Sequence, residues 1–302
     1  MHETSGRLGT VTHVSGSCQP QKFQFQDMVD GRNIISEHLS EPVHDLCFGT
    51  DLVLFAPSKP SRGSIAPLFL PLHMNGTLRS LQVDNFPQSD ALRIEIACES
   101  DFVAFGHRNG LVSLLDLRHS TSCIGAMQHE EEGADPLGSA SDLKFISPTQ
   151  LLVKRSFGSS QLHDMRRIGG SNKKNASLIH SLSVPSEEIH PTLSSHCNGL
   201  AVDPTSKQVL FSPYINSKHE SALGVWSLGT GMFLGSKILL SNPTRDMIYT
   251  EVCQKTTPAW KSGRHQDPSS FGVWLKSGRF SSTPINFKYG SLHHITLPGS
   301  WK

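Results

Sequence analysis

One pattern, found first between Val103 and Arg118, constrains the fold of this chain more than any other feature. An apolar run is followed by Asn109-Gly110, then by a second apolar run from Leu111 to Leu115, and finally by Asp116-Leu117-Arg118. Asn-Gly between two apolar runs is a strong hairpin signal, because both residues tolerate the positive φ that a type I′ turn requires. The pattern therefore predicts two antiparallel strands joined by a tight turn and closed by a charged Asp-x-Arg sequence.

The same order of parts returns three times further along the chain. The second copy runs from Asp142 to Arg166 and closes with Asp164-Met165-Arg166. The third runs from Gly199 to Leu234 with Trp226 in its closing strand, and the fourth ends at Gly272-Val273-Trp274-Leu275. A unit of this size cannot bury both faces of its sheet alone, so neighbouring units must stack on one another. The recurrence predicts an array of small antiparallel sheets.

Strands are also predicted outside these copies, from alternating or continuous apolar patterns. Before the first copy they are expected at Val11–Val14, Lys22–Asp27, Val43–Phe48, Leu52–Ala56 and Ser64–Leu72, and after the last copy Ile285–Leu297 predicts one or two more. The segment Met28–His38, which contains Gly31 and Asn33, is interpreted as a loop. No segment has the apolar spacing of an ordinary helix, and 25 glycines with 18 prolines also favour an all-β fold.

The ends of the third strands form a series along the chain that resembles a WD-repeat β-propeller. Six such ends are visible, at Asp27, Leu70, Asp116, Asp164, Ser227 and Leu275. Most of the intervals between them lie just above the roughly 40 to 45 residues of a WD repeat. We expect residues 1–302 to form a single propeller domain of six or seven blades, with seven favoured. Either the two chain ends pair to close the seventh blade, or an N-terminal piece lies outside this sequence.

Composition bounds the partners of the chain. Charged residues make up 18% and the formal net charge is +1, so no overall field favours nucleic acid or an anionic membrane. The longest apolar stretches are far shorter than the roughly 20 residues that span a bilayer. The polar start, Met1–Gly16, has no secretory signal pattern. We expect an intracellular protein of the nucleus or the cytoplasm that binds neither nucleic acid nor membrane.

Neither the cysteines nor the histidines predict a metal site or a cofactor. The six cysteines contain no C-x-x-C spacing, so we interpret them as reduced, half-buried strand residues. Among 16 histidines the densest pair is His293-His294, whose side chains point to opposite faces of an alternating strand. Gly229-Thr230-Gly231 joins two strands and is interpreted as a hairpin rather than a phosphate loop, and no Gly-x-Ser-x-Gly elbow occurs. We expect no cofactor, no metal and no enzymatic activity.

Residues 90–280 resemble the substrate receptors of cullin-4 ubiquitin ligases, in particular the fourth type of cullin-4 associated factor. The resemblance is carried by Ala104–Gly110, Leu115–Arg118, His163–Arg166 and Val225–Leu228. Those receptors have a Trp-Asp-x-Arg box at the end of a third strand, whose Arg docks the adapter of the ligase. By position, the resemblance assigns Asp116 and Arg118 to one box and Asp164 and Arg166 to the other. The tryptophan of the box is replaced by Leu115 in the first and by His163 in the second.

The physical interpretation of each box stands beside this resemblance. An Arg just beyond a strand end is exposed, and its planar fork can pair with two oxygens of a partner's carboxylate. The Asp is expected to be internal, where it accepts backbone N–H groups and holds the turn. The alternative is that Arg118 and Arg166 are solvated residues of the rim without a partner protein.

Two charged segments are further candidates for docking. One is the acidic loop His129–Asp135, and the other is a basic set formed by Lys154, Arg155, Arg166, Arg167, Lys173 and Lys174. Complementary charge at such patches guides encounter with a partner, although solvated loops look the same in sequence. Three functions remain open at this point. They are a receptor that presents an unknown substrate protein to a cullin-4 ligase, a WD-repeat scaffold of another complex, and a propeller-type hydrolase.

Overall fold

The computed structural model describes most of the chain in segments. The described residues are 7–12, 22–27, 33–39, 42–49, 52–58, 65–71, 78–81, 83–97, 101–119, 123–127, 138–156, 159–168, 177–189, 199–202, 207–240, 248–254, 270–279 and 289–296. Nearly all of them lie in strands or in the short turns between strands. Within these segments, no helix combines the length and the apolar character needed to cross a membrane.

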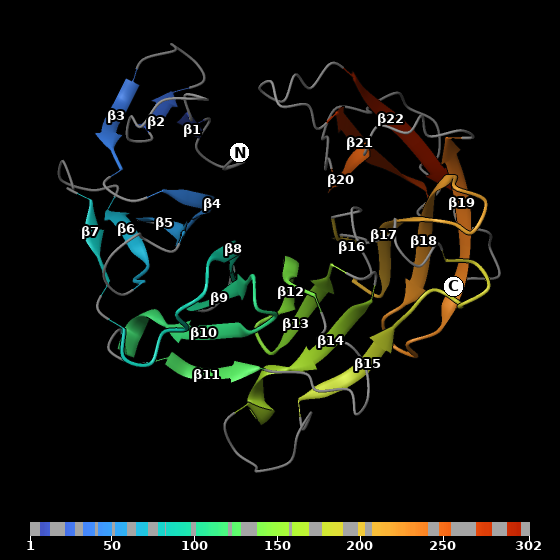
Figure 1. Cartoon of the computed structure of the whole chain (residues 1–302), viewed down its shortest axis with the longest axis horizontal. Helices are drawn as coiled ribbons and strands as arrows, with labels where there is room; N and C mark the ends of the chain where they lie inside the picture. The colour runs from blue at the N-terminus through green and yellow to red at the C-terminus, as the bar shows by residue number, and fades with distance from the viewer. Residues whose placement is uncertain are drawn as a thin grey trace. The chain divides into compact units, whose positions relative to one another are not determined.

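The strands of the first half belong to three antiparallel sheets (Figure 1). The first sheet has the order β1-β2-β3, with β1 at Arg7–Thr12, β2 at Lys22–Asp27 and β3 at Asn33–His38. The second has the order β4-β5-β6-β7, at Val43–Phe48, Leu52–Pro57, Leu68–Pro71 and Arg79–Ser80. The third joins β8 to β11, at Ala91–Ile96, Phe102–His107, Val112–Asp116 and Cys123–Met127.

Three further sheets follow in the second half of the chain. The fourth has the order β12-β13-β14-β15, at Ala140–Ser147, Gln150–Arg155, Ser160–Asp164 and Leu178–Leu182. The fifth joins β16 to β19, at Ala201–Val202, Val209–Ile215, Ser221–Ser227 and Phe233–Leu240. The sixth joins β20 to β22, at Ile248–Gln254, Ser270–Arg279 and Tyr289–Thr296. Every sheet is a meander, since neighbours in the chain are neighbours in the sheet.

The chain divides into two compact units. One comprises residues 1–150 and 164–177, and the other comprises residues 151–163 and 178–302. Both Asp-x-Arg boxes belong to the first unit. The expectation of a single domain over residues 1–302 stays a prediction, as does the number of blades.

The second strand of several sheets is buried along almost its whole length. In β5 and β9 every residue after the first is buried, and the same holds for β13. A strand covered on both faces is usually apolar at consecutive positions rather than at alternate ones. This explains why Leu52–Ala56 and Phe102–Phe105 are continuous apolar runs in the sequence.

Side chains from successive sheets share their hydrophobic cores within the first unit. One core contains Leu54 of β5 together with Val103 and Phe105 of β9. The Phe105 ring lies edge-on to Phe86, with 5.3 Å between the ring centroids. Burial of apolar area is the main favourable term in folding, at about 25 cal/mol per Å². Neighbouring sheets therefore stabilise one another, as the repeat pattern predicts.

The β9–β10 hairpin is confirmed, but its predicted type I′ turn is wrong. The amide of His107 donates to the Leu111 carbonyl at 2.8 Å, and the amide of Gly110 donates to the His107 carbonyl at 3.0 Å. Among the two predicted turn residues, only Gly110 has a positive φ, at 83°. The loop thus has three residues, with a turn followed by a left-handed glycine. The strand register agrees with this loop length. Because Gly106 pairs with Val112, His107 lies opposite Leu111, and the three residues between them form the loop.

The other strand predictions are confirmed where the structure describes their residues. Of the strand expected at Val11–Val14, Val11 and Thr12 lie in β1, and the other two residues lie outside the described part of the chain. The third strand expected within Ser64–Leu72 is β6, and the segment Ile285–Leu297 contributes β22, which pairs with β21. The loop interpretation of Met28–His38 is wrong for its second half, because Asn33–His38 forms β3 on the edge of the first sheet. An edge strand needs one partner and little apolar surface, so its pattern is weak in the sequence.

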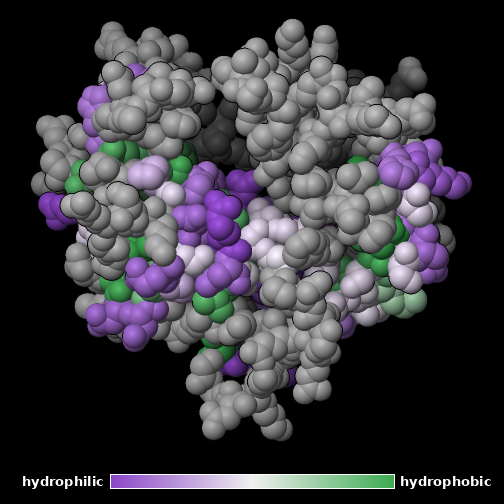
Figure 2. Space-filling model, in the orientation of Figure 1, coloured by the Kyte–Doolittle hydropathy of each residue, from purple (hydrophilic) through white to green (hydrophobic). Residues whose placement is uncertain are grey.

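The exposed surface of the described residues is mainly hydrophilic on the face in Figure 2, where apolar side chains appear in small separate areas. Among the residues whose side-chain burial the structure describes, two large apolar side chains are exposed, Ile179 of β15 and Met232 in the β18–β19 turn. Isolated apolar side chains of this kind are normal on a protein surface. Among these residues, therefore, no apolar patch marks a binding site.

Candidate functional site

The first box lies where β10 ends. Asp116 is the last residue of the strand, and Leu117–His119 form a short 3₁₀ turn directly after it. The Oδ1 atom of buried Asp116 accepts the backbone amide of Arg118 at 3.0 Å and its Nε at 2.8 Å. The Oδ2 atom accepts from the Nη2 atom at 2.6 Å. The carboxylate therefore binds one edge of the guanidinium and holds the turn at the same time.

Asp101 and Phe102, at the start of β9, contact the first box. The amide of Leu117 donates to the carbonyl of Asp101, at 2.9 Å, so the residue just before β9 lies next to the box. The Asp101 carboxylate is 3.9 Å from the Arg118 Nε atom. The guanidinium also lies over the ring of Phe102, 5.6 Å from its centroid. Although the Arg118 side chain is 59% exposed, these contacts restrict its position.

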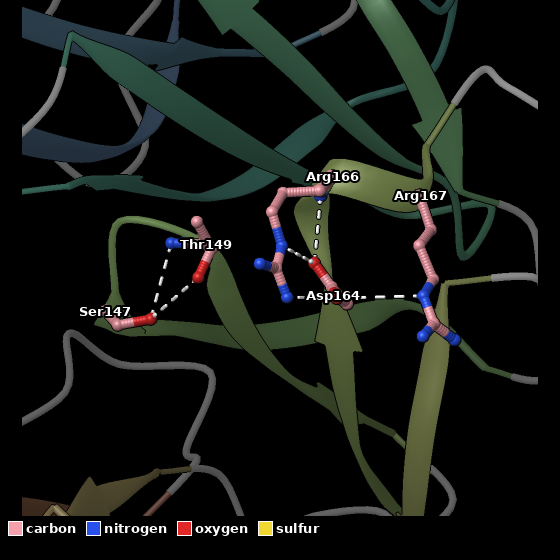
Figure 3. A network of polar contacts seen from close by, with 5 residues as sticks. All are labelled: Ser147, Thr149, Asp164, Arg166 and Arg167. Atoms are coloured by element: carbon pink, nitrogen blue, oxygen red, sulfur yellow. Dashed lines mark hydrogen bonds and ion pairs between the residues drawn. The ribbon is translucent and has the colours of Figure 1, made fainter.

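The second box repeats this arrangement where β14 ends (Figure 3). The Oδ1 atom of buried Asp164 accepts the backbone amide and the Nε atom of Arg166, each at 3.0 Å. Its Oδ2 atom accepts the Nη2 atom at 2.8 Å, and the Arg166 side chain is 71% exposed. Arg167 approaches the same Oδ2 atom at 3.7 Å. Figure 3 shows Arg166 on the side of Asp164 that faces Thr149, with Arg167 on the other side.

The charges of the two boxes are fixed by these bonds. The guanidinium of Arg166 holds the pKa of Asp164 below its usual range through hydrogen bonds. In the same way, hydrogen bonds to Asp116 and Asp164 raise the pKa values of Arg118 and Arg166. Opposite charges within hydrogen-bonding distance favour the charged form of both groups. Each box is therefore a permanent ion pair over the whole physiological range of pH.

The expected role of the two aspartates is confirmed. Both accept a backbone amide two residues further on, and both hold the turn after the strand. The arginines are exposed as expected, but each uses its Nε and Nη2 edge on its own aspartate. A partner's carboxylate would meet the remaining edge, which includes the Nη1 atom. Contact of these residues with a partner protein stays a prediction.

Sequence reasoning missed two residues beside the boxes, Asp101 and Thr149. The carbonyl of Asp101 accepts the amide of Leu117, and the carbonyl of Thr149 accepts the amide of Met165 at 2.8 Å. Both residues lie in the turn before the second strand of their sheet. The register Asp116 to Phe102 places Asp101 opposite the start of the 3₁₀ turn. The strand register, counted back from the β9–β10 loop, could have predicted that Asp101 lies beside the box. This prediction would have required a loop of three residues instead of the two that the sequence indicated.

The predicted basic docking patch is wrong for two of its members. Lys154 and Arg155 are each only 1% exposed. The Lys154 Nζ atom donates to the Ser212 hydroxyl at 2.6 Å, and burial lowers the pKa of Arg155 to about 10. They lie on β13, a strand covered on both faces, which is why adjacent charges in the sequence do not form a surface patch. Lys173, Lys174 and the acidic loop His129–Asp135 lie outside the described residues.

Other predicted features are found where the sequence placed them. Gly229-Thr230-Gly231 lies in the β18–β19 hairpin, where Gly231 has a φ of 73°. Cys47 carries a free thiol and is half-buried, and burial raises its pKa to about 12. The His293-His294 pair lies on β22, a strand. In the described part of the chain, no three residues of the metal-ligating types cluster closely enough to hold an ion.

Comparison with known proteins identifies the architecture. The chain is similar to the crystal structure of the β-propeller domain of Cps50 (Swd1) from Myceliophteria thermophila, with a TM-score of 0.55. The match covers 93% of this chain and 79% of that chain, at 14% sequence identity. The fold is a β-propeller. The all-β propeller predicted from the repeats is thereby confirmed.

The similarity extends to the fold alone. No family model and no curated protein matches the sequence. Propellers serve many unrelated functions, so this architecture does not choose among them. The function must be argued from particular residues on the propeller, and the two boxes are the strongest candidates.

Proposed function

We propose that this propeller is a non-enzymatic scaffold for protein interactions, and more narrowly a substrate receptor of a cullin-4 ubiquitin ligase. The supporting observation is the repetition of one exposed ion pair at two strand ends. Asp116 with Arg118, and Asp164 with Arg166, adopt the same set of three hydrogen bonds. Isolated surface arginines seldom share a fixed geometry, because long exposed side chains lose entropy when they are held. A repeated geometry favours recognition by a partner.

The held arginines are suited to bind an acidic surface. Because Asp116 and Asp164 fix each guanidinium before the partner arrives, less side-chain entropy is lost on binding. The partner would be the adapter of the ligase, contacted at Arg118 and Arg166, while another surface of the propeller would hold the substrate protein. This proposal implies that the protein is intracellular, in the nucleus or the cytoplasm. It implies neither a cofactor nor contact with nucleic acid or membrane.

The test is an affinity pull-down of the tagged chain from cells. Wild type is compared with the double variant Arg118→Asp and Arg166→Asp, after circular dichroism has shown that both are folded. Arg108→Asp is a matched control, because Arg108 is an exposed arginine paired with Asp90 at 2.7 Å at the other end of the β9–β10 hairpin. Wild type and the control should retrieve the cullin-4 adapter, and the double variant should not.

One outcome would contradict the receptor function, and another would contradict the role of the boxes in it. If neither wild type nor the control retrieves the adapter, the chain is a scaffold of another complex, and the proteins that do co-purify identify that complex. If the folded double variant still retrieves the adapter, the boxes are not the docking site. A propeller hydrolase is the remaining alternative, and a stoichiometric metal ion in the purified protein would favour it.

A further inference from the structure

The two boxes differ at one equivalent position. In the first, the amide of Leu117 donates to the carbonyl of Asp101. In the second, the amide of Met165 donates to the carbonyl of Thr149. The donors each follow the box aspartate, and the acceptors each lie in the turn that precedes the second strand of the sheet. Thr149 therefore occupies the place of Asp101.

This replacement changes the sign of the local charge. The first box combines two carboxylates, Asp116 and Asp101, with the single cation Arg118. The second combines the single carboxylate Asp164 with two cations, Arg166 and Arg167. The first therefore has an excess of one negative charge, and the second has an excess of one positive charge. An anion at position 149 would compensate that excess.

We propose that Thr149 is a phosphorylation site, and that its phosphate pairs with Arg166 as Asp101 approaches Arg118. A phosphothreonine carries about −1.5 to −2 charges at pH 7 and three strong acceptor oxygens. Pairs between a guanidinium and a phosphate are charge-assisted and favour two parallel hydrogen bonds. The phosphate would bring the net charge of the second box close to that of the first. The two boxes would then present similar surfaces.

The surroundings of the hydroxyl fit this role. Thr149 is half-buried in the turn between β12 and β13, on the side of Asp164 where the exposed Arg166 lies, with Arg167 on the other side (Figure 3). Its Oγ1 atom lies 3.4 Å from the Ser147 Oγ atom, an exchangeable contact between two hydroxyls. In the transfer, the Thr149 oxygen bonds to the γ-phosphorus of ATP and the bond to the leaving ADP breaks. A base of the protein kinase takes the hydroxyl proton.

The effect of this phosphate does not depend on a ubiquitin ligase. A phosphate at Thr149 would share Arg166 with Asp164, so it would alter the binding of any partner that uses this arginine. Ser147, two residues before Thr149 and followed by Pro148, is the nearest competing hydroxyl. Experiments must therefore distinguish the two hydroxyls.

The first test locates the phosphate. The tagged chain is expressed in eukaryotic cells, purified in the presence of phosphatase inhibitors and fragmented for mass spectrometry, with Thr149→Val as the control. A phosphate on Thr149 that is absent in the control is the expected result. An unmodified Thr149, or a phosphate on Ser147 alone, would overturn the proposal.

The second test measures the contact with Arg166 directly. Phosphothreonine is incorporated at position 149 during synthesis of the full chain, and its second pKa is followed by phosphorus NMR. A nearby guanidinium stabilises the dianion, so the pKa should lie below the value near 6 of an exposed phosphate. Arg166→Ala should restore the value near 6, whereas Arg118→Ala should leave it unchanged. A pKa that does not respond to Arg166→Ala would contradict the pairing.

Discussion

At the scale of single residues, the fold contains close contacts that only one type of residue can make. The Trp226 ring lies against Gly224 on the same strand, and its Nε1 atom donates to the Ser183 carbonyl at 3.2 Å. Phe233 of the next strand packs on the ring, with 5.3 Å between the centroids. An indole buried with its N–H bonded combines apolar burial with a fixed orientation. Gly224 is required because a Cβ atom there would overlap the ring.

The first prediction follows from this contact. Gly224→Ala should lower the free energy of unfolding by roughly 1 to 3 kcal/mol, because overpacking forces the indole out of its position. Gly229→Ala is the matched control, since a Cβ at Gly229 would have no atom within 4 Å. Urea denaturation followed by tryptophan fluorescence measures both. Equal effects of the two substitutions would show that the close approach is not required.

The second prediction concerns a charged group between inner strands of the first unit. Asp45 of β4 accepts the Ile94 amide at 3.2 Å and lies 3.8 Å from Arg93 of β8. The neighbouring ionisable groups are His44 and Cys47 on β4, Asp90, Arg93 and Glu95 on or beside β8, Asp142 and Lys144 on β12, and Arg108. Burial raises the pKa of Asp45 to about 6 from an ordinary value of 3.8, although the side chain stays 26% exposed.

The sign of its pH dependence follows from this shift. Between pH 4 and pH 6 the folded chain binds a proton at Asp45 that the unfolded chain has lost, so stability falls as the pH rises through this range. After allowance for its exposure, the group should contribute roughly 1 to 2 kcal/mol to that fall. Asp45→Asn keeps an acceptor for the Ile94 amide, and it should remove the contribution of Asp45 to the pH dependence of stability. Urea denaturation at pH 4 and pH 6.5 measures the difference, and identical pH slopes for both proteins would contradict it.

At the scale of elements, two hairpins use the same three-residue loop. In β17–β18 the amide of Asn216 donates to the Glu220 carbonyl at 2.9 Å, and the amide of His219 donates to the Asn216 carbonyl at 3.0 Å. The third loop residue has a positive φ in each hairpin, at Gly110 and at His219. The Asn216 side chain also accepts two loop amides, those of Lys218 and Glu220. The left-handed third residue is thus the shared requirement.

The third prediction tests this loop in β9–β10. Gly110→Ala should cost about 1 to 2 kcal/mol, because a Cβ is disfavoured at its positive φ. Asn109→Gly should cost up to about 1 kcal/mol, because it adds freedom to the unfolded chain without relieving strain. Thermal unfolding of the two variants provides the measurement. A gain in stability for Asn109→Gly would instead support the type I′ turn that the sequence alone indicated.

At the scale of the whole molecule, successive sheets of the first unit are coupled through shared cores. Leu54 and Ala56 of β5 belong to the same cluster as Val103 and Phe105 of β9, with Phe86 from the segment between the sheets. A second cluster joins Phe23 of β2 to Phe55 of β5, whose rings are 5.1 Å apart. In repeat proteins such contacts between neighbours supply much of the stability.

The fourth prediction tests this coupling. Phe105→Ala should destabilise the fold by about 3 to 5 kcal/mol, since it leaves a cavity in the shared core. Hydrogen exchange should become faster in β5 as well as in β9, because both strands line that cavity. Phe105→Leu, a smaller loss of volume, should show the same pattern with a smaller effect. Faster exchange confined to β8–β11 would show that the sheets are independent.

The sequence by itself determined most of the strands, the repeat and the strand ends at Asp116, Asp164 and Ser227. The end expected at Leu275 is wrong, because β21 continues to Arg279. Continuous apolar runs such as Leu52–Ala56, and the Asp-x-Arg sequence after β10, depend on the local chain and are visible without partners. The internal role of Asp116 was also predictable, because its bonds go to Arg118, two residues away. Contacts over so short a distance depend on few other features of the fold.

Only the tertiary structure decided which residues those elements meet. It buried Lys154 and Arg155 because another sheet covers β13, and it made Asn33–His38 an edge strand because β2 offered a partner. It also brought Asp101 and Thr149 to the boxes through strand register. A register depends on the length of a loop and on pairing between distant segments, and neither is encoded at one position. The composition of the surface around the boxes therefore followed from packing, whereas the positions of the strands followed from local pattern.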